Sequence, residues 1–261
     1  MNLDLKGKRA IVCGSTQGLG LASAVELALL CCNITLVARN EEKLKDALTN
    51  LAGSGSQQHN YLVADFDDTS MVKNAIDAFT KNNTVHILVN NTGGPSGGAA
   101  LTATADEFLS AFNNHLINNH HLVQAVVPGM KTAGFGRIVN IISTSVKIPI
   151  SGLGVSNTIR GAVANWAKTL ATELGPFGIT VNNVLPGFTK TGRADYVIAA
   201  KAQKTGKTTD EVMAGLLTEI PAGRIGLPEE FGAAVAFLCS PSAAYINGIN
   251  LPVDGGRLGC L

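Results

Sequence analysis

The fold is decided by one stretch near the N-terminus, Arg9-Ala-Ile-Val-Cys-Gly14-Ser-Thr-Gln-Gly18-Leu-Gly20. Its first half is a short apolar run that ends in glycine, which is typical of a buried strand. Its second half places three glycines where a helix opens. There the backbone can approach a pyrophosphate, and the helix N-terminus offers free N–H groups. A glycine-rich turn without a ligand has the same local sequence, so the rest of the chain must decide between the two interpretations.

Apolar runs and helical segments alternate along the rest of the chain. The predicted strands cover residues 9–14, 34–38, 59–64, 86–90, 136–142, 179–185 and 248–253. The predicted helices cover residues 18–30, 41–51, 71–80, 104–130, 155–174 and 228–238, and the fourth opens with the capping box Thr104-Ala-Asp-Glu107. This alternation predicts an α/β fold, with one doubly wound domain over residues 1–261 and a seven-stranded parallel sheet covered by helices on both faces.

The segment 189–222 does not fit this alternation, because it is rich in Lys, Thr, Ala and Gly. A long excursion of this kind is usually a lid or a binding loop. Ligands of doubly wound sheets sit at the carboxyl ends of the strands, where this segment begins. We therefore expect the segment 189–222 to contact a substrate.

The composition excludes several classes of protein. Of 261 residues, 46% are hydrophobic and 15% are charged, against a usual charged share of about 25%. A disordered chain would be richer in charge, and the low share indicates that part of the surface is buried between subunits. The net charge of +1, without a basic block, argues against a nucleic-acid partner. No apolar run reaches the ~18 residues of a membrane span, and the charged start does not resemble a signal peptide.

The cysteines and histidines point away from disulfides and metals. Five cysteines without a Cys-x-x-Cys pair indicate a reducing compartment, so we expect the protein in the cytoplasm. The five histidines do not have the spacing of metal ligands, so we predict no catalytic metal. The Gly-x-Ser-x-Gly motif of many hydrolases is also absent from the sequence.

Four further motifs follow the glycine-rich turn in order, and with it they resemble the short-chain dehydrogenase/reductase family over nearly the whole chain. They are Asn90-Asn-Thr-Gly93, Pro186-Gly-Phe-Thr-Lys-Thr191, Gly223-Arg-Ile-Gly-Leu-Pro-Glu-Glu230 and Val253-Asp-Gly-Gly256. Many members with this C-terminal pattern are β-ketoacyl carrier-protein reductases. The resemblance implies a Rossmann-like domain, a nicotinamide cofactor, a small carbonyl or alcohol substrate, and a homotetramer.

The glycine-rich turn and the resemblance together assign a set of cofactor-binding residues. They are Gly14, Ser15, Thr16, Gly18, Leu19, Gly20, Arg39, Asn40, Asp65, Phe66, Asn90, Gly93, Arg160, Pro186, Gly187, Thr189 and Thr191. By resemblance, Asp65 would bond the adenine, Asn90 would hold the loop near the cofactor ribose, and Thr191 would touch the amide or the phosphates. Each of these three has a structural alternative: Asp65 and Thr191 could only cap helices, and Asn90 could only form a turn.

The end of the second strand favours NADP(H) over NAD(H). An acidic residue there would bond the adenosine 2′-hydroxyl, whereas an arginine accommodates a 2′-phosphate. The chain reads Val37-Ala-Arg39-Asn40, without an acid. A cation just ahead of a helix is unfavourable for the helix dipole, so Arg39 is better explained if an anion faces it. Ser15 and Thr16 could add hydroxyl donors, and a solvated surface arginine is the alternative.

The catalytic positions depart from the family pattern of Asn, Ser, Tyr and Lys. Ser143 aligns with the catalytic serine, but the Tyr-x-x-x-Lys motif thirteen residues on has become Ser156-Asn-Thr-Ile-Arg160. His115 stands where the Asn is expected, and Asn114 could restore it only by a register shift. An alkyl hydroxyl is far less acidic than a phenol, and arginine cannot be deprotonated, so we expect a slow or unusual reductase.

In such a reductase, Ser143 would polarise the carbonyl and Arg160 would hold the cofactor ribose. The proton would come from Ser156 with water, or from His115 or Tyr196. Loss of a positioned acid costs on the order of 10²–10⁴ in rate, while orientation of the cofactor alone still favours hydride transfer.

The predicted substrate pocket is lined by residues 94–96, 146–153 and 189–222. These are mostly aliphatic and supply no dedicated pair of arginines for a carboxylate, so we expect a ketone or ketoacyl group.

Two other functions stay open. One is a non-catalytic NADP-binding protein or silent subunit of a mixed oligomer, and the other is a dehydratase or isomerase without net redox change. We expect self-association through residues 104–130, residues 155–174 and the C-terminal strand.

Overall fold

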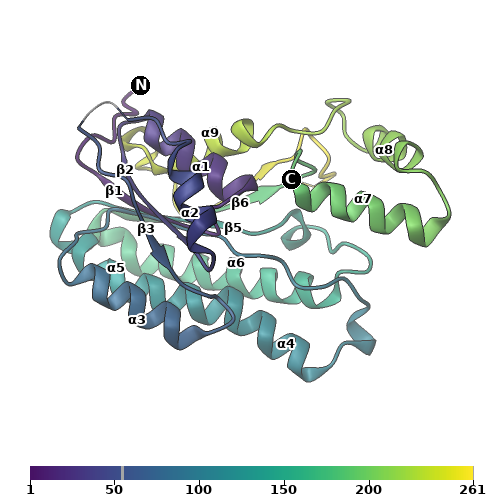
Figure 1. Cartoon of the computed structure of the whole chain (residues 1–261), viewed down its shortest axis with the longest axis horizontal. Coiled ribbons are helices and arrows are strands. Elements are labelled where there is room, and N and C mark those ends of the chain that lie inside the picture. The colour runs from purple at the N-terminus through teal and green to yellow at the C-terminus, as the bar shows by residue number, and fades with distance from the viewer. Residues whose placement is uncertain (54–55, 261) are drawn as a thin grey trace.

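Seven strands form one parallel sheet, with the order β3-β2-β1-β4-β5-β6-β7 in the computed structural model (Figure 1). The strands are β1 Arg9–Cys13, β2 Asn33–Ala38, β3 Asn60–Val63, β4 Ile87–Asn90, β5 Gly136–Ile141, β6 Ile179–Pro186 and β7 Asn250–Val253. The structure describes residues 1–53 and 56–260, so residues 54, 55 and 261 of the predicted domain lie outside the described part. The predicted parallel sheet of seven strands is confirmed.

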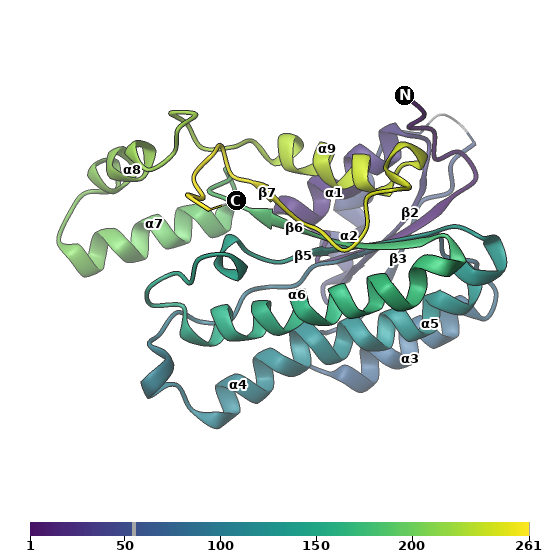
Figure 2. The same cartoon turned by 180° about the vertical axis from the view of Figure 1, so that it is seen from behind.

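Helices cover both faces of this sheet, as Figures 1 and 2 show from opposite sides. One face carries α1 (Gly18–Leu29), α2 (Glu41–Leu48) and α9 (Pro228–Cys239), and the other carries α3 (Thr69–Thr80), α5 (Asn118–Ala133) and α6 (Gly154–Leu174). Neighbouring side chains of a strand point to opposite faces of the sheet. Val12 packs against the first group of helices, and Ile11 packs against the second. The five inner strands are buried on both faces and therefore read as largely apolar runs, whereas the edge strands β3 and β7 are only partly buried. Within the described residues, no helix is long and apolar enough to cross a bilayer.

A row of four asparagines crosses the sheet, and we call it the asparagine ladder. Asn90, Asn140, Asn183 and Asn250 occupy matched register positions on β4, β5, β6 and β7. Nδ2 of each residue donates to Oδ1 of the next, at 2.8 Å, 2.9 Å and 2.8 Å. Buried amides need hydrogen-bond partners, and these amides supply partners to one another. The ladder therefore holds four neighbouring strands in register close to the sheet edge where ligands bind.

The helix predicted over residues 104–130 is not one continuous α-helix. It consists of α4 (Ala105–Phe112), a π-helical turn (Asn113–Ile117) and α5, which continues to Ala133. The predicted capping box is confirmed: Glu107 N donates to Thr104 Oγ1 at 3.2 Å, and Thr104 N donates to Glu107 Oε2 at 2.7 Å. A π turn changes the number of residues per turn, so it shifts the helix register for the residues that follow.

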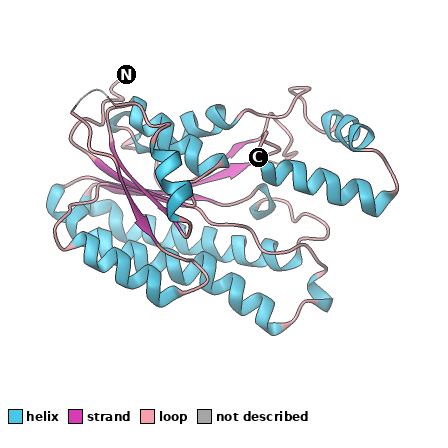
Figure 3. Cartoon of the chain, viewed as in Figure 1, coloured by secondary structure: helices cyan, strands magenta, loops and turns pink. Residues whose placement is uncertain are grey.

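The segment 189–222, which was predicted to be a lid or a binding loop, is largely helical. It forms α7 (Gly192–Thr205) and α8 (Thr209–Thr218), which project from the body of the molecule (Figures 1 and 3). The two helices share a small core of their own, made of Ile198, Ala202, Val212 and Leu216. At their base, Thr189 is buried and pairs with Gly226 in an isolated β-bridge. This pair of helices is therefore joined to the body at a narrow base.

Candidate active site

The glycine-rich turn lies where the strand order reverses, between β1 and β4. Its backbone is folded tightly, because a Cβ on Gly20 would overlap the carbonyl oxygen of Gly14. Asn91, which follows β4, clamps this turn. Its Nδ2 donates to the carbonyl oxygens of Cys13 at 3.2 Å and Gly14 at 3.1 Å. The turn is thus held in shape at the point where doubly wound sheets bind their ligands.

The N-terminus of α1 opens at this turn without a side-chain cap. The N-cap residue Gln17 makes no capping hydrogen bond from its side chain, and the first turn has no acidic residue. The free N–H groups and the positive end of the helix dipole fit the phosphates of a dinucleotide. Ser15 is fully buried and its Oγ accepts from Val37 N at 3.0 Å, so its role as a hydroxyl donor to the cofactor stays a prediction. Thr16 is half-buried, while Leu19 packs against the core.

The segment from Pro186 to Thr191 lies opposite the glycine-rich turn. A Cβ on Gly18 would lie 3.7 Å from Cγ2 of Thr191. The hydroxyl of Thr191 caps α7, so the helix-cap interpretation is confirmed, and its methyl group is the part that faces Gly18. Gly187 has a packing reason to be glycine, because a Cβ there would lie 2.6 Å from Cα of Asp254. The motif 186–191 thus lies beside both the glycine-rich turn and the last motif of the chain.

Arg39 follows β2 as an exposed cation, and a protein carboxylate faces it. Its Nη1 lies 3.7 Å from Oδ2 of Asp67, and the two side chains are 71% and 66% exposed. The sequence predicted an anion opposite Arg39, but it did not identify Asp67. An exposed pair of this kind contributes at most about 1 kcal/mol. Arg39 can therefore exchange Asp67 for a phosphate at little cost.

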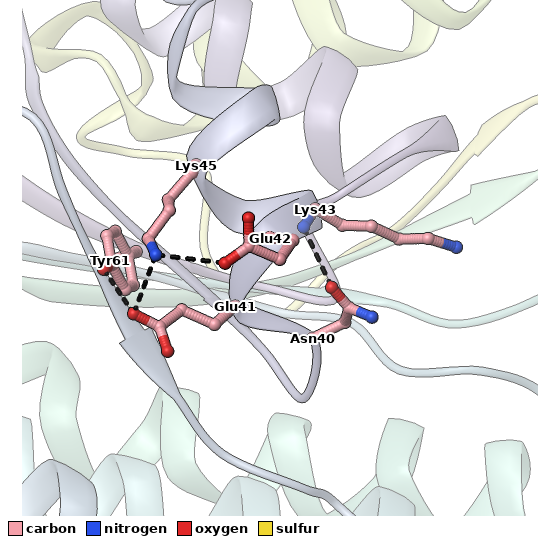
Figure 4. A network of polar contacts seen from close by, with 6 residues as sticks. All are labelled: Asn40, Glu41, Glu42, Lys43, Lys45 and Tyr61. Atoms are coloured by element: carbon pink, nitrogen blue, oxygen red, sulfur yellow. Dashed lines mark hydrogen bonds and ion pairs between the residues drawn. The ribbon is translucent and has the colours of Figure 1, made fainter.

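The charges of α2, which follows Arg39, are balanced largely within that helix (Figure 4). Asn40 is the N-cap, and its Oδ1 accepts from Lys43 N at 2.9 Å. Lys45 Nζ lies 3.3 Å from Glu41 Oε1 and 3.1 Å from Glu42 Oε1. The side-chain oxygen of Asn40 is thus occupied by its capping role, and the prediction that Asn40 contacts the cofactor rests on its amide nitrogen.

Asp65 and Phe66 form the turn that follows β3. Asp65 Oδ1 accepts from Asp67 N at 3.1 Å, whereas the N-cap of α3 is Asp68, so the helix-cap alternative for Asp65 is wrong. Phe66 is buried, and its carbonyl oxygen accepts from Asn118 Nδ2 at 2.7 Å. This bond ties the start of α5 to the turn. The predicted adenine contact of Asp65 stays a prediction.

Asn90 is the last residue of β4 and the first member of the asparagine ladder, so the interpretation of Asn90 as a turn former is wrong. Its Oδ1 is buried and has no hydrogen-bond partner within the described residues. The loop that follows contains Gly93, which is exposed. A strand-end amide with a free acceptor is consistent with the predicted role of holding this loop, which remains a prediction.

His115 lies on the π turn and is 2% exposed. Burial and the positive charge of Arg160 lower the pKa of His115 to about 2, although a hydrogen bond to the backbone of Gly93 acts in the opposite direction. The imidazole is therefore neutral near pH 7 and cannot deliver a proton as an imidazolium. Asn114 does not take its place, because Asn114 Nδ2 donates to Asp67 Oδ1 at 2.7 Å.

Ser143 lies just past the end of β5, and Ser156 and Arg160 lie on α6. Ser143 follows β5, and its Oγ accepts from Ser145 N at 3.1 Å. Ser156 and Arg160 are four residues apart on α6, so they share one face of the helix. Arg160 is buried, and its Nη1 donates to the carbonyl oxygen of Ile141 at 3.0 Å, at the end of β5. The π turn that carries His115 also packs against α6.

The walls predicted for the substrate pocket are joined to one another. Gly98 N donates to Gly152 O at 2.8 Å, and Gly154 N donates to Gly98 O at 2.9 Å. From α7, Arg193 Nη2 donates to Pro95 O at 3.4 Å. Two surface hollows lie elsewhere, at the amino ends of β4 and β6, and no candidate residue lines them. Nor do residues 1–53 and 56–260 contain a group of three His, Cys, Asp or Glu that could hold a metal.

Sequence reasoning missed three residues of this region. Asp67 links Arg39 to Asn114, Asn118 ties α5 to the turn after β3, and Arg193 reaches the loop after β4. No local pattern marks the first two. Arg193 could have been found from the sequence, because it is the single arginine of the segment 189–222, which was predicted to contact the substrate.

Comparison with known proteins agrees with this geometry. Residues 14–257 match the sequence profile of a family described as enoyl-(acyl carrier protein) reductase. A 3-oxoacyl-acyl-carrier-protein reductase of Haemophilus influenzae is 32% identical over 253 residues, which cover 97% of this chain and 98% of that protein. A chloroplastic tropinone reductase homologue of Arabidopsis thaliana is 32% identical over 255 residues, which cover 97% and 76%. The L-sorbose reductase of Gluconobacter frateurii, in complex with NADPH and L-sorbose, has a TM-score of 0.93 at 28% identity, with both chains fully covered.

Proposed function

Since the chain belongs to the short-chain dehydrogenase/reductase family, we propose that it is an NADP(H)-dependent oxidoreductase with an atypical proton donor. Its substrate carries a ketone or ketoacyl group, or is a secondary alcohol. One observation carries the proposal. Gly18 of the nucleotide turn faces Thr191, and two residues further on Arg193 lies with Arg160 beside the loop after β4. Arg160 in turn donates to the carbonyl oxygen of Ile141, two residues before Ser143, so these contacts connect the cofactor turn with the end of β5.

NADP(H) fits the residues at the cofactor end of the site. The uncapped N-terminus of α1 suits a diphosphate, and Arg39 suits a 2′-phosphate, because no acid ends β2. The L-sorbose reductase that shares this fold is in complex with NADPH. When bound, the nicotinamide supplies or accepts the hydride. The protein orients it through the glycine-rich turn, Asn91 and Thr191.

Ser143 and Arg160 act on the reacting end. Ser143 donates from its hydroxyl to the carbonyl oxygen of the substrate and so polarises the carbonyl. Arg160 stands in place of the family lysine. Its buried Nε has no hydrogen-bond partner within the described residues, so this N–H can donate to a hydroxyl of the cofactor ribose. The positive charge of the Arg160 guanidinium also stabilises the negative charge that develops on the substrate oxygen.

We assign the proton to Ser156 with a water molecule, because Ser156 shares the α6 face of Arg160. His115 is neutral and acts as a hydrogen-bonding group. Tyr196 is the second candidate: it is 64% exposed on α7, and its ring centroid lies 5.4 Å from Cζ of Arg193. Without the family tyrosine, we expect turnover slower by on the order of 10²–10⁴.

Paired variants test this proposal. In the double variant Ser156→Tyr with Arg160→Lys, we expect reduction of a neutral ketone to rise at least tenfold, measured by loss of NADPH absorbance. Ser143→Ala should abolish the activity of the parent and of the double variant. If the double variant shows no turnover while NADPH still binds, the reductase proposal fails.

The replacement of the family tyrosine by Ser156 also supports a second candidate function. It favours a protein that binds NADP(H) without turnover, or a silent subunit of a mixed oligomer. Tight NADPH binding without reduction of any ketone, in the parent and in the double variant, would identify this function.

The homotetramer and the cytoplasmic location belong to the same proposal. Exposed apolar side chains at Leu101, Leu109 and Phe112, in and ahead of α4, support self-association. The unpaired thiols of all five cysteines support a reducing compartment. Sedimentation of a stable monomer at micromolar concentration would overturn the tetramer.

A further inference from the structure

Two arginines from distant parts of the chain meet beside Gly94. A Cβ on Gly94 would lie 3.9 Å from Nη2 of Arg160 and also 3.9 Å from Nη2 of Arg193. The two nitrogens are therefore separated by no more than twice that distance. Gly94 is exposed, so a ligand can reach the space between them. The sequence did not predict that these two arginines meet, because their proximity depends on α7 bringing Arg193 back to the loop after β4.

Arg160 is a buried cation whose charge the protein leaves unbalanced. It is 8% exposed, and its side chain makes one hydrogen bond, to the carbonyl oxygen of Ile141. Across residues 1–53 and 56–260, no carboxylate lies within ion-pair distance of it, and its Nε has no partner. Burial and the like charge of Arg193 lower the pKa of Arg160 to about 10. An unpaired buried charge is costly, so an anionic ligand would relieve it.

Arg137 is a second buried arginine of this fold, and the protein supplies more hydrogen-bond acceptors to it than to Arg160. It is 3% exposed and donates to the carbonyl oxygens of Gly136, Gly178 and Ser240. It also lies 4.2 Å from the ring centroid of Phe135. Arg160 has one carbonyl where Arg137 has three, so its remaining donors are left for something outside the chain.

Arg193 is held in place without being neutralised. Its Nη2 donates to Pro95 O, and its guanidinium lies over the ring of Tyr196. It makes no ion pair with a carboxylate in the described part of the chain. It is the second residue of α7, so the positive end of that helix dipole lies near the same space.

From these contacts we infer that the substrate carries a carboxylate close to its reacting carbon, and that Arg160 and Arg193 hold this carboxylate beside Gly94. The inference rests on the proposed function and names its substrate class, short-chain oxo acids or the corresponding hydroxy acids. A ribose hydroxyl can satisfy Nε of Arg160 but cannot neutralise the charge. A carboxylate accepts from both guanidinium groups and balances one positive charge in a partly buried place.

Matched acids and esters test the inference. We would compare kcat/KM for 2-oxobutanoate and 3-oxobutanoate with kcat/KM for their methyl esters. We would also titrate each acid into the protein–NADP⁺ complex by calorimetry. We expect each acid to be preferred over its ester at least tenfold. Arg193→Gln should lower this ratio and the acid affinity at least tenfold, and Arg193→Lys should recover part of both. Lys204→Gln removes the same charge near the far end of α7 and should change neither.

The outcomes separate this inference from the proposed function. If esters and neutral ketones are reduced while acids neither bind nor gain any preference, the carboxylate site is overturned and the reductase stands. If no compound is reduced but the acids bind in a way that depends on Arg193, the carboxylate site stands and the reductase fails. If Arg193→Gln weakens NADPH binding as much as acid binding, the arginine pair serves the phosphates of the cofactor and the inference is overturned.

Discussion

The side-chain amide of Asn91 donates at 3.1 Å to the carbonyl oxygen of Gly14, and so ties the loop after β4 to the turn after β1. A second bond from the same nitrogen reaches Cys13 O. These two bonds hold the nucleotide turn before any ligand arrives. Preorganisation of this kind reduces the free energy lost in ordering the site on binding.

Removal of this clamp should weaken cofactor binding. We expect Asn91→Ala to raise the Kd for NADPH about tenfold, because two hydrogen bonds that shape the turn are lost. Fluorescence titration measures this change. Thr92→Ala, one residue along the same loop, is the control and should leave the Kd within about twofold. Equal Kd values for the Asn91→Ala variant and the parent would show that the turn keeps its shape without the clamp.

The asparagine ladder should contribute strongly to stability. Asn140→Ala removes two of its hydrogen bonds and leaves two buried amide atoms, Nδ2 of Asn90 and Oδ1 of Asn183, without a partner. We expect the free energy of unfolding in urea to fall by about 2–4 kcal/mol, since each unpaired buried polar group costs about 1–3 kcal/mol. Asn250→Ala, at the half-buried end of the ladder, breaks one bond and should cost about half as much. Equal losses at the two positions would contradict a cooperative row.

Arg39 should decide between the two nicotinamide cofactors. We expect Arg39→Asp to raise the Kd for NADPH at least tenfold while the Kd for NADH changes little, because only NADPH carries the 2′-phosphate. Fluorescence titrations with both cofactors give the comparison. Lys81→Asp, beyond the far end of α3, makes the same charge change and serves as the control. Equal loss of both cofactors in Arg39→Asp would refute the assignment.

His115 should make the protein sensitive to acid. Its folded pKa of about 2 lies below its ordinary value of 6.5, so the unfolded chain takes up a proton that the folded chain excludes. Stability is therefore full above pH 6.5 and falls as the pH drops below it, by about 2 kcal/mol between pH 7 and pH 5. We expect His115→Asn to lose less stability than the parent over this range, measured by urea unfolding at both pH values. Parallel losses would show that His115 is not the group responsible.

The inner strands could be predicted because they are buried on both faces, so that runs such as Ala10–Cys13 are apolar throughout. The π turn at His115 could not be predicted, because tertiary packing against α6 and α3 accompanies a change of one residue in the helix register. The helices of the segment 189–222 were missed because their apolar positions are few and their Lys, Thr and Gly content favours loops. Helix formation there depends on the pairing of α7 with α8.

Site residues could be predicted where they belong to a short sequence motif. They could not be predicted where the site depends on contacts between residues far apart in the sequence. The glycine-rich turn and Thr191 were found as motifs. The ladder of Asn90, Asn140, Asn183 and Asn250 depends on strand order and register, which the spacing of these residues does not reveal. The meeting of Arg160 with Arg193 likewise requires the path of α7 back toward the loop after β4.

The two-helix unit of α7 and α8 has a consequence for how proteins with this architecture diverge. Its helices bury their apolar side chains against each other, and the bridge between Thr189 and Gly226 joins its two ends to the body. Mutations, insertions or replacement of the segment between these two residues therefore leave the two large cores of the sheet intact. Natural selection can then change which molecules are admitted to the site without first compensating for a loss of folding stability.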